Sequence, residues 1–278
     1  MAAGGTDRNG GPYGQLQANK KESSSRVLGV VQDITERRQA EAKINDFIKR
    51  LKESNDELEH FAYIASHDLR APLRAISHLA QWVSEDCEDI LPEQSKDHLA
   101  TLQRRIQRLD NMLEGLLQYS RVGRVKEEIK TVSLGKVVDD IKSLMDIPPH
   151  CSIHCVGPLP TFQCQEVPLS MVLRNLIENA IKHRAGNAQT VVISCKDNGA
   201  FYEISVTDDG PGIPKDQHEK IFGLFTTLKS RDQLETSGLG LAIVKKAIKY
   251  QGGTINVYSN DNMKGVTFTF TWPKKPVL

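Results

Sequence analysis

Between residues 44 and 83 the apolar side chains recur at alternating steps of four and three, the spacing that places them in one stripe along an α-helix. A second series with the same spacing follows at residues 99–116, and the segment EDILPEQS at residues 88–95 predicts a turn between them. The two stripes therefore predict an antiparallel helical hairpin. The first stripe comprises Ile44, Ile48, Leu51, Leu58, Ala62, Ala65, Leu69, Ile76, Leu79 and Val83, with Asn55 and Pro72 in its two gaps, and the second comprises Leu99, Leu102, Ile106, Leu109, Leu113 and Leu116.

One hairpin leaves apolar surface uncovered, so we expect two copies to pair into a dimeric four-helix bundle. Asn55 at a stripe position would fix the register of that pairing at some cost in stability. The side chain of Asp33 or Thr35 can accept the free N–H groups at the start of the first helix. Residues 1–26, rich in Gly, Ser, Asn and Lys, predict a flexible segment, and a short apolar strand begins at residue 27.

After the segment SRVGRVKEE, residues 120–128, short strand-like runs alternate with amphipathic helical patterns. This alternation predicts a separate α/β sandwich domain. We therefore divide the chain into residues 1–34, a helical hairpin at 35–124 and an α/β domain at 125–278. Helices are expected near residues 135–145, 167–184 and 239–251, and strands around 151–155, 191–195, 201–207, 254–259 and 266–272.

The composition narrows the function classes. With 278 residues, 39% of them hydrophobic, the chain can bury a sizeable core, and a net charge of +1 argues against a nucleic-acid binder. No apolar run approaches the ~20 residues that cross a bilayer, and no signal peptide opens the chain. Five cysteines, an odd number at irregular spacing, favour a reducing cytoplasm over a disulfide framework. HCSIHC at residues 150–155 lacks the paired spacing of a zinc module, so a strand is the better interpretation.

The stretch ASHDLRAPLR, residues 65–74, carries a candidate nucleophile. His67 falls midway between two stripe residues, so the pattern places it on the exposed face of the helix. Pro72 cannot donate to the carbonyl of Asp68, which costs ~3 kcal/mol and gives the helix a place to bend. Asp68 can accept a hydrogen bond from one imidazole nitrogen and make the other more nucleophilic. These residues are typical of a phosphoryl acceptor, although a solvated surface histidine would also account for this stretch taken alone.

Three further stretches are candidates for a nucleotide site. NLIENAIKH, residues 175–183, places Asn175, Asn179 and Lys182 or His183 along one helix face, where amide oxygens can ligate Mg²⁺ and a cation can meet phosphate. A polar surface face is the alternative. VTDDGPGIP, residues 206–214, ends a strand in a glycine-rich loop where a carboxylate could accept the adenine amino proton.

The third stretch, SGLGLAIVKK at residues 237–246, leads two glycines directly into a helix N-terminus, which favours phosphate. The Rossmann pattern fails because position 243 is not glycine, and no GxxxxGK[ST] loop occurs. Each loop alone is weak support for a nucleotide site, but the three stretches in this order are much more specific.

Together these motifs resemble those of the sensor histidine kinases. ASHDLRAPLR resembles their H-box, and the three later stretches resemble the N, G1 and G2 boxes of the ATP-binding domain of the gyrase–Hsp90–histidine kinase–MutL (GHKL) type. KIFGLFTTLK, residues 220–229, resembles the intervening F-box, within a lid at about 214–237. The resemblance covers residues 36–278 and implies a HisKA-type dimerisation and phosphotransfer domain before the ATP-binding domain.

The resemblance also implies roles for individual residues. His67 would be the phosphoacceptor and Asp68 the base, Asn179 the Mg²⁺ ligand and Asp208 the adenine-binding aspartate. The other residues implied to lie at the ATP site are Asn175, Lys182, His183, Gly210, Gly212, Lys229, Arg231, Gly238, Gly240 and Thr267.

The implied function is ATP- and Mg²⁺-dependent phosphorylation of His67, followed by transfer to an aspartate on the receiver domain of a response regulator. A non-catalytic dimeric scaffold and an ATPase of the same fold are the alternatives. GVVQDITERRQAE, residues 29–41, resembles the end of a PAS sensor domain, but too little precedes it to enclose a ligand, so we expect no working sensor here. Two departures stand out: Ala71 predicts weak phosphatase activity, and Thr236, in place of a glycine, predicts a stiffer lid.

Overall fold

The computed structural model describes residues 33–124, 127–183, 189–227, 237–259 and 265–275. It divides into two compact units, residues 1–51 and 52–278. The described part of the first unit is the N-terminal part of helix α1 (Thr35–Asp86). The backbone N–H of Thr35, the first residue of this helix, donates to Asp33 Oδ1 over 2.9 Å, so Asp33 satisfies one of the free N–H groups at the helix start. The predicted strand from residue 27 and the PAS-like segment before residue 33 lie outside the described residues.

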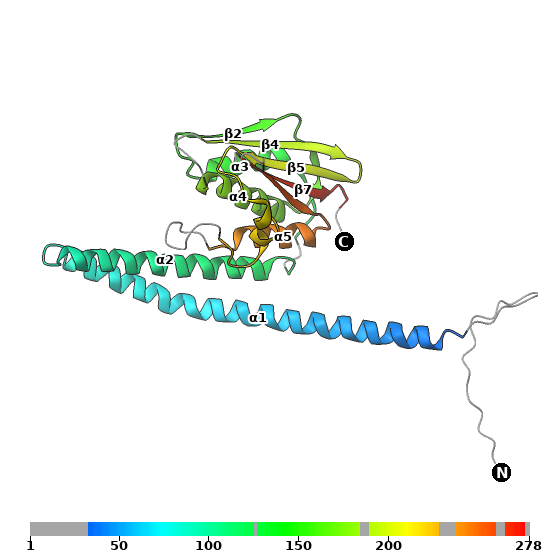
Figure 1. Cartoon of the computed structure of the whole chain (residues 1–278), viewed down its shortest axis with the longest axis horizontal. Coiled ribbons are helices and arrows are strands. Elements are labelled where there is room, and N and C mark those ends of the chain that lie inside the picture. The colour runs from blue at the N-terminus through cyan, green and yellow to red at the C-terminus, as the bar shows by residue number, and fades with distance from the viewer. Residues whose placement is uncertain (1–32, 125–126, 184–188, 228–236, 260–264, 276–278) are drawn as a thin grey trace, which may run out of the picture. The chain divides into compact units, whose positions relative to one another are not determined.

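Helix α1 continues through Pro72 without interruption, and a turn at residues 87–92 leads into α2 (Glu93–Arg121), so the predicted hairpin is confirmed (Figure 1). Its two arms run antiparallel, as three contacts show. The guanidinium of Arg124 donates to the Asp56 carbonyl, Arg121 lies over the Tyr63 ring, and Arg70 pairs with Glu114. Residues later in α1 therefore contact residues earlier in α2. Within the described ranges no helix is both long and apolar enough to cross a membrane.

The face of α1 that is covered within the chain lies one residue beyond the predicted stripe. Ser66, Arg70 and Ala80 are shielded, whereas the stripe residues Leu69 and Leu79 are 52% and 57% exposed. The stripe is therefore an uncovered apolar surface of the single chain rather than the contact between α1 and α2. The side chains of Leu58 and Ala62, also in the predicted stripe, lie outside the described ones.

The α/β domain follows the hairpin in the second unit, and its predicted helices are present. Ser133 begins α3 by accepting the Lys136 N–H on its hydroxyl, and α4 and α5 follow with apolar faces that are buried. The elements are β1 (Lys130–Ser133), α3 (Leu134–Leu144), β2 (Cys151–Val156), β3 (Thr161–Cys164), α4 (Glu166–Lys182), β4 (Gln189–Asn198), β5 (Phe201–Asp208), the short 3₁₀ helices η1 (Lys215–Gln217) and η2 (Lys220–Phe222), α5 (Gly240–Tyr250), β6 (Ile255–Ser259) and β7 (Val266–Pro273).

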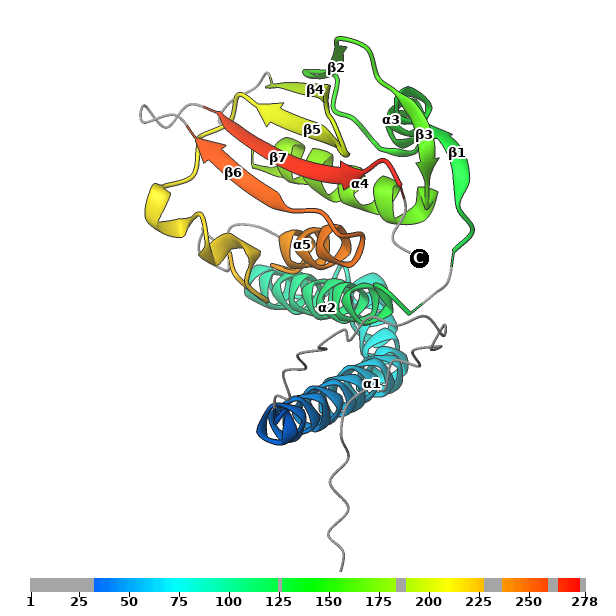
Figure 2. The ribbon, with the colours of Figure 1, turned by 90° about the vertical axis from the view of Figure 1, so that its right-hand side faces the viewer.

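Five strands form one mixed sheet in the order β2-β4-β5-β7-β6, with β2 parallel to β4 and the other neighbours antiparallel. Figure 2 shows α4 and α5 side by side along one face of this sheet, and the core lies between these two layers. This arrangement confirms the predicted sandwich. Strands β1 and β3, which the sequence pattern did not predict, pair with each other in a separate two-stranded sheet. The largest fully buried side chains of the domain include Leu169, Leu173, Leu176, Ile177, Ile193, Ile204, Phe270 and Trp272.

Candidate phosphoacceptor and nucleotide sites

His67 lies on the open face of α1, and its side chain is 72% exposed, as the stripe predicted. Its Nδ1 atom lies 3.2 Å from Asp68 Oδ1. A carboxylate only accepts hydrogen bonds, so in this contact Nδ1 is the donor. In the imidazole tautomer that carries its proton on Nδ1, the lone pair is on Nε2, the nitrogen that Asp68 does not engage.

One turn after His67, Arg70 connects α1 to α2, a contact that the sequence reasoning missed. Its Nη2 atom binds Glu114 Oε2, and its Nε atom lies 4.0 Å from Asp110 Oδ1. The Arg70 side chain is only 22% exposed. The sequence offered one signal for this contact: Asp110 and Glu114 are four residues apart on α2, and Arg70 follows the histidine by three residues on α1.

On α4, the two asparagines lie toward the start of α5. A Cβ atom on Gly240 would meet Asn175 Oδ1 at 2.9 Å and Asn179 Nδ2 at 3.8 Å, so both carboxamides adjoin the glycine loop. Asn175 Nδ2 donates to the Met171 carbonyl over 2.9 Å. Lys182 instead pairs with Glu178 over 3.2 Å, and His183 caps the end of α4.

The backbone beside α5 is tightly constrained. Gly238 has φ of +68°, and a Cβ atom there would lie 2.8 Å from the backbone carbon of Phe225. Phe225 itself has φ of +59°, a left-handed conformation that is rare for a bulky residue and marks local strain. This close approach of two loops requires glycine at position 238 and leaves the N-terminus of α5 next to the asparagines.

Asp208 ends β5 with a largely buried carboxyl group. Burial raises the pKa of Asp208 above its ordinary value, and the Gly210 N–H, which donates to Oδ1 over 2.8 Å, partly opposes the rise. Gly210 adopts the turn that allows this bond, and Gly212 has φ of +79°. The predicted aspartate and its loop glycines are thus brought together at the edge of the helix layer.

Thr267 lies on the other face of the sheet. It pairs with Thr207, and the two hydroxyls lie 3.1 Å apart, whereas Asp208 pairs with Val266. Side chains alternate between faces along a strand, so the Thr267 hydroxyl points away from the face that carries Asp208. Val266 is the β7 residue directly beside Asp208. Lys229, Arg231 and Thr236, also predicted for the site or its lid, lie outside the described residues.

The first turn of α5 rests on α2, a second contact that the sequence did not predict. Leu239 is fully buried, and a Cβ atom on Gly115 would meet its Cδ1 at 2.8 Å. Farther along α5, Lys246 donates to the Tyr119 carbonyl over 2.9 Å and lies over the Tyr119 ring. Gly115 thus forms a notch in α2 for the residue that begins the phosphate-loop helix.

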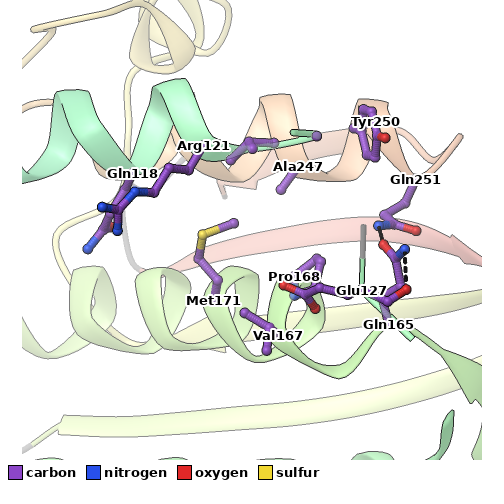
Figure 3. Close-up of a pocket in the computed structure, with 12 residues that line it drawn as sticks. Gln118, Arg121, Glu127, Gln165, Val167, Pro168, Met171, Ala247, Tyr250 and Gln251 are labelled. Atoms are coloured by element: carbon purple, nitrogen blue, oxygen red, sulfur yellow. Dashed lines mark hydrogen bonds between the residues drawn. The ribbon is translucent and has the colours of Figure 1, made fainter. Parts of the chain in front are cut away.

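Figure 3 shows a separate pocket, which is lined by the end of α2, the start of α4 and the end of α5. Gln251 donates to Gln165 over 2.6 Å, and Gln165 donates to the Glu127 carbonyl over 3.1 Å. These two bonds connect the segment between α2 and β1 to the start of α4 and the end of α5. Burial raises the pKa of Glu127. None of the predicted ATP-site residues lines the pocket.

Asn179 supplies the test of whether the site suits Mg²⁺. Its Nδ2 atom is buried and has no hydrogen-bond partner among the described residues. A buried carboxamide with an unpaired end can take a partner from outside the chain, and a half-turn of the amide would present its oxygen to a hard cation at this position, so the residue is compatible with the predicted role. Among the described residues no group of three or more His, Cys, Asp and Glu is placed to hold a metal.

Two family models match the chain. Residues 57–124 match the His Kinase A (phospho-acceptor) domain, and residues 164–276 match the histidine kinase-, DNA gyrase B- and HSP90-like ATPase. The first match covers the hairpin with His67, and the second covers the domain with Asn179, Asp208 and both glycine loops. The chain belongs to the histidine kinases.

Curated relatives match most of this chain. Cyanobacterial phytochrome B of Nostoc is 35% identical over 80% of this chain and 30% of its own length. The phytochrome-like protein Cph1 of Synechocystis is 31% identical over 85% of this chain and 32% of its own. The chain thus spans about a third of these relatives. Full-length ShkA, solved in complex with AMPPNP, shares the fold with a TM-score of 0.59 at 24% identity, over 78% of this chain and 46% of ShkA.

Proposed function

We propose that the protein is an ATP-dependent protein-histidine autokinase that phosphorylates His67 and passes the phosphoryl group to an aspartate on a response regulator receiver domain. The observation that carries this proposal is the exposed His67–Asp68 pair, held on a helical hairpin of the same chain that bears a buried aspartate–glycine nucleotide site. The His67–Asp68 pair alone, or the aspartate–glycine site alone, would not require a kinase. A kinase that phosphorylates itself explains why one chain carries both a nucleophile and a nucleotide site.

The chemistry follows from the imidazole geometry. With Nδ1–H directed at Asp68, the Nε2 lone pair attacks the γ-phosphorus of ATP. The P–N bond forms as the bond to the ADP oxygen breaks, and the Nδ1 proton passes to Asp68. Positioning and charge neutralisation account for most of the rate in phosphoryl transfer, so an exposed but oriented imidazole is sufficient as nucleophile.

The ATP site divides between three elements. The ionised carboxylate of Asp208 accepts the adenine amino proton, and the loop with Gly210 and Gly212 lets the backbone approach the base. The N-terminus of α5, entered through Gly238 and Gly240, offers its N–H groups to the phosphates. Asn179, with Asn175 beside it, would hold Mg²⁺, which neutralises phosphate charge when bound. Lys182 and His183 at the end of α4, together with Lys229, complete the proposed phosphate contacts.

A homodimer would cover the apolar stripe of α1. Ala71 offers no side-chain oxygen to orient a water, so we expect weak phosphatase activity toward the regulator. All five cysteines are free thiols in the structure, which supports a reducing, cytoplasmic setting.

The decisive experiment incubates the protein with γ-labelled ATP and Mg²⁺ and compares it with the His67→Gln variant. We expect an acid-labile, base-stable label that disappears in His67→Gln. His78→Gln is the matched control, because His78 is another exposed histidine of α1 and should keep the label.

Two outcomes would contradict the proposal. Absence of label and of nucleotide binding would favour a dimeric scaffold for a regulator. Steady ATP hydrolysis without labelling of the protein would favour an ATPase of the same fold.

A further inference from the structure

Arg70 is placed where it can control the phosphoacceptor without contacting it. It lies one helical turn after His67, and its side chain turns inward toward α2 while the His67 side chain turns outward. The two therefore share one turn of α1 but face opposite surroundings. Any force that holds Arg70 against α2 also holds the backbone that carries the imidazole.

The carboxylates of Asp110 and Glu114 on α2, which are 40% and 49% exposed, favour a nearby cation. Asp110 and Glu114 are four residues apart, so their like charges face the same side and repel. Asp110 Oδ1 is buried and has no hydrogen-bond partner in the described part of the chain, which makes that carboxylate costly unless a cation compensates it. The Arg70 guanidinium lies between the two, bonded to Glu114 and 4.0 Å from Asp110.

The turn that Arg70 holds is weakened by Pro72. Proline has no N–H, so the carbonyl of Asp68 loses its helical partner immediately after His67. The helix is continuous there, yet one backbone hydrogen bond that would define its geometry is missing. A side-chain contact between helices can replace that constraint, and the Arg70 cluster lies two residues before the proline.

We propose that Arg70 is a positioning residue for phosphorylation of His67, acting as an ionic brace that fixes the H-box turn of α1 on α2 through Glu114 and Asp110. The inference rests on the proposed autokinase activity. The brace is also next to the contact with the ATP-binding domain, because Gly115, which receives Leu239, directly follows Glu114. The phosphoacceptor turn and the phosphate-loop helix are thus both attached to adjacent residues of α2.

The test compares initial rates of autophosphorylation for Arg70→Gln and the unmodified protein over a range of ATP concentrations. A misplaced reacting group costs up to about 100-fold, so we expect the maximal rate to fall roughly 10- to 100-fold while KM for ATP stays unchanged. Arg50→Gln is the matched control, because Arg50 forms an ion pair with Asp46 on the same helix with 76% of its side chain exposed, and it should leave the rate unchanged.

A charge swap separates positioning from a direct role. Arg70→Glu alone places three carboxylates together and should lower the rate further than Arg70→Gln does. Adding Glu114→Arg places one cation beside two carboxylates again, and the double variant should react at least tenfold faster than Arg70→Glu. If Arg70 contacted the phosphoryl group itself, the swap would not restore activity, and that outcome would overturn the brace.

The remaining outcomes are equally distinct. An Arg70→Gln protein that labels at the normal rate contradicts the inference and leaves the autokinase proposal standing. A fall in melting temperature or loss of dimer that accounts for the whole loss of rate reduces Arg70 to a structural residue, which also contradicts it. No label in the unmodified protein refutes the proposed function itself.

Discussion

At the scale of single residues, Asp208 links ATP binding to pH. Burial raises the pKa of its carboxyl group, while binding of the adenine amino group needs the ionised form. We therefore predict that ATP affinity falls on acidification at a higher pH than an ordinary aspartate would give. The native state also holds the proton more tightly than the unfolded chain, so this group's contribution to stability declines as pH rises through the raised pKa.

Calorimetric titration with ATP at a series of pH values measures this effect. Asp139 on α3, 75% of whose side chain is exposed, provides the control, since Asp139→Asn should leave the whole profile unchanged. Asp208→Asn should bind ATP weakly at every pH and lose the acid-side decline. An affinity that stays constant down to the pKa of a free aspartate would contradict the role of Asp208.

The exposure of His67 could be predicted from the sequence, whereas the face of the sheet that carries Thr267 could not, for a physical reason. The exposure of His67 follows from helical periodicity, a local pattern that extends over many residues of α1 and can be recognised in the sequence. The face of Thr267 depends on pairing between β5 and β7, where a shift of one residue reverses every side chain. That register comes from the tertiary structure around Gly265, whose N–H donates to the Gly210 carbonyl over 2.7 Å, and a motif alone does not specify it.

At the scale of elements, the notch at Gly115 makes a prediction about α2 and α5. In an ordinary helix Gly→Ala stabilises by about 1 kcal/mol. Here the added Cβ would lie 2.8 Å from Leu239 Cδ1 and 3.1 Å from its Cβ, and overpacking of this kind costs ~1–3 kcal/mol. We expect Gly115→Ala to loosen the first turn of α5 from α2, seen as faster hydrogen exchange at residues 239–243.

Gly135→Ala in α3 is the matched control, because its Cβ would meet Leu159 only at 3.8 Å, an ordinary contact. That variant should raise the melting temperature slightly and leave exchange in α5 unchanged. Unchanged exchange in Gly115→Ala as well would mean that the contact between Gly115 and Leu239 does not hold α5 on α2.

Long periodic elements were predictable and short or paired ones were not. The hairpin and the three helices of the α/β domain follow from repeats of ten residues or more. Strands β1 and β3 span four residues each, too few to establish a period, and they are defined by pairing with each other. The stripe on α1 was identified but assigned to the wrong neighbour, because periodicity marks an apolar face without saying what covers it.

At the scale of the whole molecule, that uncovered face argues for a second copy. Soluble proteins rarely expose a continuous apolar patch of this length without a partner. The hairpin already has its own internal contact, so we propose that a second hairpin would bury an identical stripe on each copy. Its exposed members include Ile44, Ile48, Leu51, Leu69, Ile76, Leu79 and Val83.

Leu79→Asp tests the dimer without disturbing the single chain, because Leu79 is 57% exposed there. Burying one leucine contributes ~1.5–3 kcal/mol, and each dimer loses two while gaining two buried charges. We expect sedimentation to show dimer for the unmodified protein and monomer for Leu79→Asp at micromolar concentration, with the same melting of the α/β domain. Ile90→Asp, in the turn between the helices and 78% exposed, should remain dimeric. If Leu79→Asp also sediments as a dimer, the stripe on α1 is not the surface that joins the two copies.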